Sequence, residues 1–262
     1  MNRSEFDAAY RGLILDQSFL EGSSYYLERK ERYWNTLSRL EPFLEADARM
    51  LDIGGGQFAL LAKRLFRCQP EVADLDSRYR TSIDSAGIPF HHLNLVEDDF
   101  RFERPFQLVM MGEVIGHVPV PPHLVFEKLA DTLAPGGRLA ITTPNLFRLR
   151  NVIRMIRAKP LFYHFMQPCK DMPPGHFIEY DREHMEWQMR RAGLDVEVSE
   201  YAQLDLGGAT PSARVARRLI APLLWLRPVW KDNLFAVGRK PQMAKPDGAN
   251  TTDRSGHARH TP

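Results

Sequence analysis

The segment Asp52-Ile53-Gly54-Gly55-Gly56 combines a carboxylate with a glycine turn. The turn follows a short apolar stretch at residues 49–53 and precedes an amphipathic stretch at residues 58–66, which predicts a strand, a turn and a helix in that order. Glycine has no Cβ to obstruct a ligand, and the first amides of a helix point out of its end. Such a turn can hold a ligand against bare backbone, although a glycine turn alone suits many nucleotides.

A second acidic segment, Asp74-Leu75-Asp76, ends the next predicted strand about twenty residues later. A carboxylate at this position can accept hydrogen bonds from both hydroxyls of a ribose. We expect Asp74 to take this role, and Asp76 is the alternative because either residue could end the strand. The turn and the carboxylate together predict a site for a cofactor of the adenosine type.

Strand and helix patterns alternate along the chain, which is typical of a parallel sheet covered by helices. The pattern predicts an α/β fold with a doubly wound, mostly parallel seven-stranded sheet and helices on both faces. Residues 1 to about 45 have the pattern of a helical extension. The expected strands cover residues 49–53, 71–74, 89–93, 106–111, 138–143, 194–201 and 233–238.

The spacing Asp52-x-Gly54-x-Gly56 resembles the acidic-x-Gly-x-Gly signature of class I methyltransferases, which use S-adenosylmethionine. Phe58 departs from the family, which commonly has a third glycine at this position. Later segments resemble the family in the same order, and the resemblance covers roughly residues 25 to 240. These segments are the strand at residues 106–109, the segment at residues 113–118, the Pro-Gly-Gly turn at residues 133–139, the strand end at residues 143–145, and residues 176–194.

The resemblance implies a Rossmann-like domain at residues 46–240, after an N-terminal helical cap at residues 1–45. It also implies lid segments at residues 145–180 and 203–231, and the polar composition of residues 241–262 predicts a disordered tail. Asp52 would meet the amino group of the cofactor or orient the loop, and Asn94 would offer an acceptor oxygen to adenine. The implied cofactor residues are Asp52, Gly54, Gly56, Asp74, Asp76, Asn94, Leu95, Met111 and Gly112.

Methyl transfer is an in-line displacement, and a general base helps when the acceptor is a hydroxyl. The candidates for this base are Glu113, His117 and His176, with Tyr180 as a further one. Some quinone-biosynthesis methyltransferases have Glu-x-x-Glu-His here and bind a divalent metal. Gly116 replaces the second carboxylate in this chain, so we expect no metal site.

Two segments, residues 145–165 and 211–231, each contain five basic residues and no acidic one, interleaved with apolar residues. We favour the interpretation that they are lid helices whose apolar sides pack on the sheet. The alternative is peripheral membrane contact through residues 211–231. An anionic or lipid-linked acceptor, such as a glycan precursor, would suit both interpretations.

Composition sets further limits. The formal net charge of +2 gives no case for nucleic-acid binding by the whole protein. Two distant cysteines, Cys68 and Cys169, fit a reducing cytoplasm, and the N-terminus lacks the apolar core of a signal peptide. We therefore expect a cytoplasmic enzyme, with the membrane surface as the alternative location. The sequence makes no prediction of the oligomeric state.

The favoured function is transfer of a methyl group from S-adenosylmethionine to a hydroxyl of a small molecule or saccharide. A lipid-linked or quinone-like acceptor is one alternative. A non-catalytic module that binds the cofactor or a partner is a second, and Phe58 and Gly116 are its best support. A nicotinamide-dependent oxidoreductase is a third, because glycine turns also bind NAD.

Overall fold

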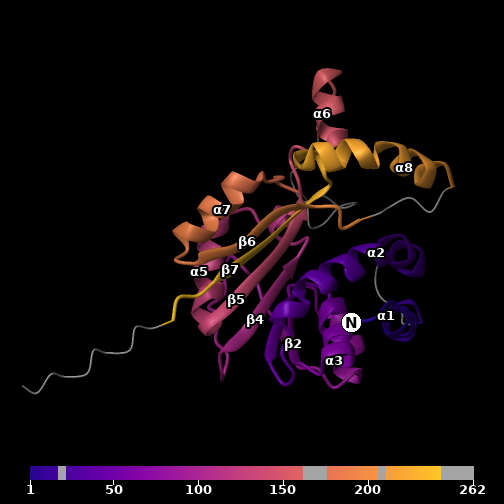
Figure 1. Ribbon diagram of the computed structural model, residues 1–262. Coiled ribbons are helices and arrows are strands. Elements are labelled where there is room, and N and C mark those ends of the chain that lie inside the picture. The colour runs from indigo at the N-terminus through magenta and orange to yellow at the C-terminus, as the bar shows by residue number, and fades with distance from the viewer. Residues whose placement is uncertain (17–21, 162–175, 206–210, 243–262) are drawn as a thin grey trace, which may run out of the picture.

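The computed structural model describes residues 1–16, 22–161, 176–205 and 211–242 of the chain (Figure 1). Parts of the predicted lid segments and most of the predicted tail therefore lie outside the described residues. The strands are β1 (Arg49–Ile53), β2 (Gln69–Asp74), β3 (Phe90–His92), β4 (Phe106–Gly112), β5 (Leu133–Pro144), β6 (Asp195–Ala202) and β7 (Asn233–Arg239). They form one seven-stranded sheet in the order β3-β2-β1-β4-β5-β7-β6.

The first five strands run parallel to one another, and β7 runs antiparallel to both β5 and β6. This arrangement confirms the predicted seven-stranded, mostly parallel sheet. Each strand overlaps its expected range, and the continuous apolar run of β4 identifies a strand that is buried on both faces. All five residues of β1, an interior strand of the sheet between β2 and β4, are buried.

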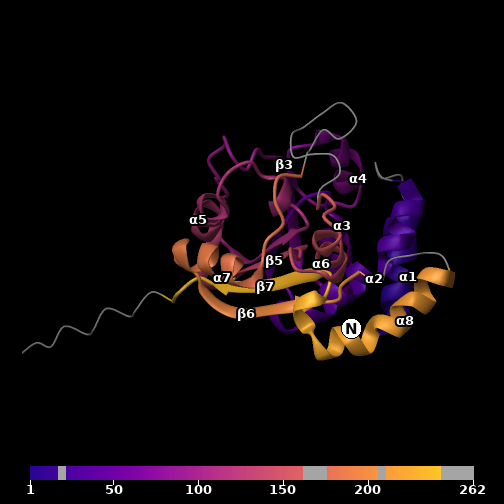
Figure 2. The same cartoon turned by 90° about the horizontal axis from the view of Figure 1, so that it is seen from above.

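The helices are α1 (Arg3–Tyr10), α2 (Gly22–Leu40), α3 (Gln57–Phe66), α4 (Arg80–Ser85), α5 (Pro122–Thr132), α6 (Leu149–Ile156), α7 (Arg182–Arg191) and α8 (Pro211–Leu226), and a π-helical turn at Arg11–Leu15 follows α1. Figures 1 and 2 show α1, α2 and α3 on one side of the sheet and α5 and α7 on the other. The helices α6 and α8 lie together beyond one end of the strands (Figure 1).

Alternate residues of the central strands pack into two separate apolar clusters. Met50 and Leu108 join the cluster that contains the apolar residues of α1, α2 and α3. Leu51 and Val109 join the cluster formed with α5 and α7. Successive side chains of a strand point to opposite faces, so the sheet separates two cores.

The strand β5 begins at Leu133, five residues before the expected start at Arg138. The segment Pro135-Gly136-Gly137 is therefore an irregularity within the strand, and it lies opposite a register shift in β4 between Phe106 and Leu108. Gly136 has a φ of +78°, a conformation that glycine adopts without strain. Because glycines commonly mark turns, the sequence pattern placed the strand start too late.

The helix α6 begins at Leu149, four residues after Asn145, where the segment expected to form a lid helix starts. Asn145 is buried, and its side chain forms hydrogen bonds that link the end of β5 to other segments. Its Nδ2 donates to the carbonyl oxygens of Val229 and Lys231, both at 2.7 Å. Its Oδ1 accepts from the backbone N–H of Phe147 at 3.0 Å. The end of β5 is thereby fixed to the segment that leads into β7.

Candidate functional site

The glycine turn joins β1 to α3, as the sequence predicts. Gly54 and Gly56 have φ angles of +129° and +87°, which L side chains rarely adopt. A Cβ on Gly56 would lie 2.4 Å from Cδ1 of Ile83, so this glycine allows α4 to pack against the turn. Gly54 instead faces a cavity and contributes to its lining.

The buried carboxylate of Asp52 lies beneath the start of α3. Its Oδ2 accepts a hydrogen bond from the backbone N–H of Ala59 at 2.9 Å, which fixes the first turn of the helix. Burial raises the pKa of Asp52 to about 7, against the opposing effect of the N–H groups of Ala59 and Phe58. Asp52 is absent from the described lining of the cavity, so its side chain orients the turn.

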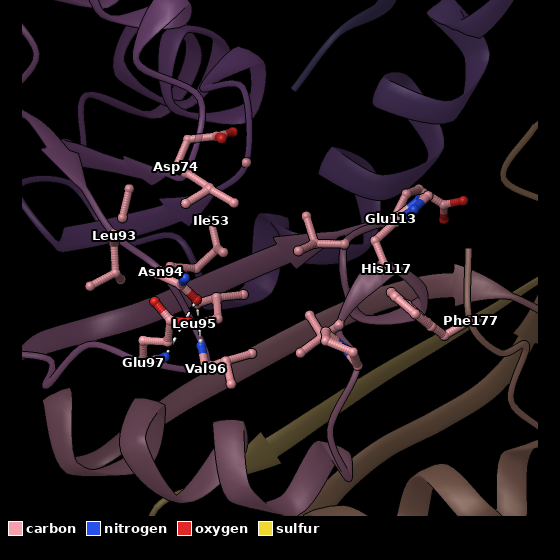
Figure 3. Close-up of a pocket in the computed structure, with 16 residues that line it drawn as sticks. Ile53, Asp74, Leu93, Asn94, Leu95, Val96, Glu97, Glu113, His117 and Phe177 are labelled. Carbon is pink, nitrogen blue, oxygen red and sulfur yellow. Dashed lines mark hydrogen bonds between the residues drawn. The ribbon is translucent and has the colours of Figure 1, made fainter. Parts of the chain in front are cut away.

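A cavity of about 440 Å³ opens beside the glycine turn (Figure 3). Asp74 and Asn94 lie towards one end of it, and Glu113 and His117 lie towards the other (Figure 3). Its residues come from the ends of β1 and β2, from the segments that follow β1, β2, β3 and β4, and, at Phe177, from the segment before α7. The lining consists of Ile53, Gly54, Ala73, Asp74, Leu75, Leu93, Asn94, Leu95, Val96, Glu97, Glu113, Val114, His117, Val118, Pro119 and Phe177.

The two candidate ribose carboxylates differ in their surroundings. Asp74 lines the cavity, and its Oδ1 accepts from the N–H of Asp76 at 2.6 Å. The carboxylate of Asp76 instead bonds the Arg78 guanidinium, with Nε 2.9 Å from Oδ1. Hydrogen bonding to Arg78 lowers the pKa of Asp76 below its usual range. The geometry therefore favours Asp74 over Asp76 as a ligand of a group in the cavity.

Asn94 and Leu95 both line the cavity, as expected, but the amide oxygen of Asn94 is already used. It accepts from the N–H of Val96 at 3.0 Å and from the N–H of Glu97 at 3.4 Å. These bonds fix a turn after β3, and they leave less acceptor capacity than the sequence suggested. Glu97 also lines this end, and sequence reasoning missed it because no pattern distinguishes it from a surface acid.

Glu113, immediately after β4, has a φ of +60°, and both its backbone and its side chain have polar partners. Its backbone N–H donates to the carbonyl oxygen of Thr142 at 2.9 Å. Its Oε1 accepts from Nδ2 of Asn233 at 3.2 Å, and Oε2 lies 3.7 Å from Nη1 of Arg32. A positive φ is strained for a side-chain-bearing residue, and such strain gathers at functional sites.

A second cavity, of about 740 Å³, lies on the other side of Glu113. Glu113 is the one residue that both described linings share. The second cavity is lined by Arg29, Arg32, Glu113, Pro144, Arg148, Leu149, Arg150, Ile153, Arg154, Gln203, Asp205, Ile220, Ala221, Leu224, Trp230, Asp232 and Asn233. It thus lies between α2, α6 and α8, which are far apart in the sequence.

His117 and His176 lie next to each other, with perpendicular rings and centroids 4.8 Å apart. His117 lines the first cavity, whereas His176 is absent from both described linings. A Cβ on Gly116 would lie 3.0 Å from Cε1 of His176, so the glycine allows this close packing. Burial lowers the pKa of His176 to about 4, helped by His117 and Arg148. His176 is therefore neutral near pH 7.

The remaining predicted residues, Met111 and Gly112, do not belong to the described lining. Met111 is fully buried in the core on the α5 and α7 side. Gly112 packs closely against the ring of Phe58. Both residues therefore pack in the interior next to the site and do not line its cavity.

Among the described residues, no group of three or more His, Cys, Asp or Glu side chains is arranged to hold a metal ion. Nor is any helix in the described part of the chain long and apolar enough to cross a membrane. Cys68 is buried with a free thiol, and Cys169 lies outside the described residues.

A family model described as a methyltransferase domain matches residues 25–198, more than half of the chain. No curated protein sequence matches. Among solved structures, a chain from the Haloferax volcanii complex of the Trm112 methyltransferase activator with a methyltransferase has a TM-score of 0.57 and 17% identity, over 92% of this chain and all of the other. An S-adenosylmethionine-dependent methyltransferase from Mesorhizobium loti has a TM-score of 0.55 and 16% identity, over 80% of this chain and 98% of the other.

A third similar structure is phosphoethanolamine N-methyltransferase 2 of Haemonchus contortus in complex with S-adenosylmethionine, with a TM-score of 0.54 and 18% identity over 90% of this chain and 56% of the other. At these identities the structures show a shared fold. Together with the family model, they show that the chain belongs to the methyltransferase-domain family, the class I enzymes whose cofactor is S-adenosylmethionine.

Proposed function

We propose that the chain transfers the methyl group of S-adenosylmethionine to a hydroxyl of a small molecule or saccharide, with the cofactor in the first cavity and the acceptor in the second. The observation that carries this proposal is the position of Glu113, whose side chain borders both cavities. Methyl transfer requires the donor and the nucleophile to meet in line, so a shared wall is where reaction would occur.

The residues of the first cavity fit such a cofactor. Asp74 would accept hydrogen bonds from the ribose hydroxyls, and Leu95 with Val96 would cover an adenine ring. Gly54 offers bare backbone at a φ that favours glycine, which suits the methionine portion. When bound, S-adenosylmethionine supplies an electrophilic methyl group on a sulfonium. In this arrangement Gly56, Asp52, Met111 and Gly112 hold the shape of the site, and Asp76 stays outside it.

Glu113 and His117 are the residues best placed to accept a proton from the acceptor hydroxyl. Both line the first cavity, and Glu113 also lines the second. His176 packs behind His117 and would act as a positioning residue, because a group with a pKa near 4 is a weak base at neutral pH. The helices α6 and α8 would act as lids over the acceptor.

An amine acceptor is the second candidate, since one structure with the same fold is a phosphoethanolamine N-methyltransferase. A lipid-linked or quinone-like acceptor is a third candidate, because α6 and α8 carry exposed apolar side chains, among them Ile156 and Trp225. Peripheral contact of α8 with a membrane belongs to that third candidate. In each case we place the enzyme in the cytoplasm or at the membrane surface facing it.

Calorimetry with S-adenosylhomocysteine and with NAD tests the cofactor, and mass spectrometry of a metabolite panel tests the acceptor. We expect micromolar binding of S-adenosylhomocysteine, no binding of NAD, and a gain of one methyl group on a hydroxyl. A methyl group found on nitrogen would replace the hydroxyl proposal with the amine one. Cofactor binding without transfer to any acceptor in a cell extract would favour a non-catalytic module.

A further inference from the structure

The second cavity is unusually rich in arginine. Its lining contains five arginines and three carboxylates. Arg29 and Arg32 lie on the α2 wall, and the other three arginines lie on α6 or immediately before it. The positive charge is therefore divided between two walls, which differ in how that charge is balanced.

The α2 wall is largely neutralised by the protein itself. The side chain of Asp205, only 9% exposed, bonds both Arg29 and Arg32, with Nη2 of Arg32 at 3.0 Å. Arg32 also lies 3.7 Å from Glu113. These guanidinium groups hold two acids in place and have little charge left for a ligand.

The α6 wall contains one arginine that no described carboxylate neutralises. Arg148 is bonded to the buried carboxylate of Glu179. Nε of Arg154 donates to the carbonyl oxygen of Pro160 at 2.7 Å. Arg150 is exposed and forms no ion pair with any carboxylate in the described part of the chain. Burial lowers the pKa of Arg148 against the effect of Glu179. The charge of Arg150 lowers this pKa further, and the carboxylates of Asp232 and Glu113 oppose it.

Apolar side chains line the space between these walls. They come from α6, α8 and the segment before β7, and they are Leu149, Ile153, Ile220, Leu224 and Trp230. A cavity with a cationic wall beside an apolar lining favours a ligand that has both an anionic group and a less polar body.

We infer that the second cavity binds its acceptor through an anionic group, a phosphate or a carboxylate, which Arg150 holds at the α6 wall. This inference rests on the proposed function, because it takes the second cavity as the acceptor site. A guanidinium presents a planar fork of donors that matches the oxygens of both groups. The methyl-accepting atom would then lie at the Glu113 end of the same cavity.

The anionic group has two sources, a soluble acceptor or the headgroup of a lipid. The second source is relevant because the exposed fractions of Ile156 and Trp225 are both 80%, and that of Leu219 is 76%. These side chains lie on α6 and α8, the helices that line the cavity. Probes of both kinds are therefore needed.

The test measures binding of pyrophosphate to the full chain by calorimetry, with saturating S-adenosylhomocysteine present, in the wild type, R150Q and R157Q. Arg157 follows α6, is exposed and is absent from the described cavity lining, so it is the matched control. We expect R150Q to weaken binding at least about tenfold, the effect of a lost charge-assisted hydrogen bond, and R157Q to change it less than about twofold. The same three proteins are also tested for flotation with vesicles of phosphatidylglycerol, which is anionic, and of phosphatidylcholine, which has no net charge.

If R150Q loses pyrophosphate binding, the result supports the inference with a soluble acceptor. If R150Q loses only its binding to phosphatidylglycerol vesicles, the result supports the inference with an acceptor carried by a lipid. Equal responses of R150Q and R157Q to both probes, or no binding of either, overturn it. S-adenosylhomocysteine binding is recorded separately for each protein, and its failure in the wild type would count against the proposed function instead.

Discussion

The ring of Phe58, in α3, packs directly against Gly112, the last residue of β4. A Cβ on Gly112 would lie 2.6 Å from Cε2 of Phe58, and the ring of Phe58 also packs on Tyr33 with centroids 4.9 Å apart. The family commonly has a glycine where Phe58 stands, so in this chain a ring from α3 fills space that a glycine would leave open. Gly112 has no side chain and so leaves room for the Phe58 ring, and Tyr33 of α2 packs on the same ring.

The variant Gly112→Ala tests this pairing. Since the added methyl group would overlap the Phe58 ring, we expect the free energy of unfolding to fall by about 1–3 kcal/mol, as for other overpacked cores. In the double variant Phe58→Leu with Gly112→Ala, a smaller side chain removes the overlap, and the two effects should be less than additive. Urea denaturation of the wild type, both single variants and the double variant measures the coupling. Strict additivity would mean that the two residues do not constrain each other.

Asp74 and Asp76 should differ in their effect on cofactor affinity. Asp74 lines the first cavity, whereas Asp76 is paired with Arg78. Asp74→Ala should weaken S-adenosylhomocysteine binding by about ten- to a hundredfold, the loss of one or two hydrogen bonds to a carboxylate. Asp76→Ala, as the matched control, should weaken it by no more than about threefold. Calorimetry on both variants decides, and a reversed order would assign the ribose to Asp76.

His176 should make stability depend on pH. Its pKa is about 4 in the folded chain against a usual 6.5, so between these values the unfolded chain binds a proton that the folded chain does not. The free energy of unfolding therefore falls as the pH falls from about 6.5 to about 4, and at pH 5 this loss reaches about 2 kcal/mol. Asp52 acts with the opposite sign, because burial raises its pKa to about 7 and stability from this group is lost as the pH rises through that value.

The variant His176→Gln isolates the histidine contribution, since Asp52 is unchanged in it. We expect the stability difference between wild type and variant to favour the variant progressively as the pH is lowered from 7.5 to 5. Thermal or urea denaturation at several pH values gives this difference. A difference that stays constant over the range would mean that His176 titrates normally in the folded chain.

The sequence predicted the sheet and the glycine turn because both depend on short-range patterns. Short strand patterns located all seven strands, and Gly54 and Gly56 occur where the backbone needs a positive φ. The same patterns could not show that Asn94 uses its amide oxygen within its own turn, since that depends on local geometry. They also could not predict the second cavity, which joins α2 to α6 and α8 across most of the chain.

Glu113 gives the most direct test of where the methyl group is transferred. Glutamine has nearly the same shape, would still accept from Asn233 and would have the same positive φ, so Glu113→Gln removes the charge with little other change. Arg32 would keep Asp205 as its partner.

If Glu113 accepts the proton of the acceptor hydroxyl, kcat should fall by about 10²- to 10⁴-fold, while S-adenosylhomocysteine affinity should change less than about threefold. Asn233→Ala removes the donor to Glu113 and keeps the Glu113 carboxylate, so it should have a smaller effect on kcat. Steady-state kinetics of both variants beside His117→Gln would identify the base. If Glu113→Gln kept full activity and His117→Gln lost it, the proton would go to the histidine, and the carboxylate would serve only to position Arg32 and Asn233.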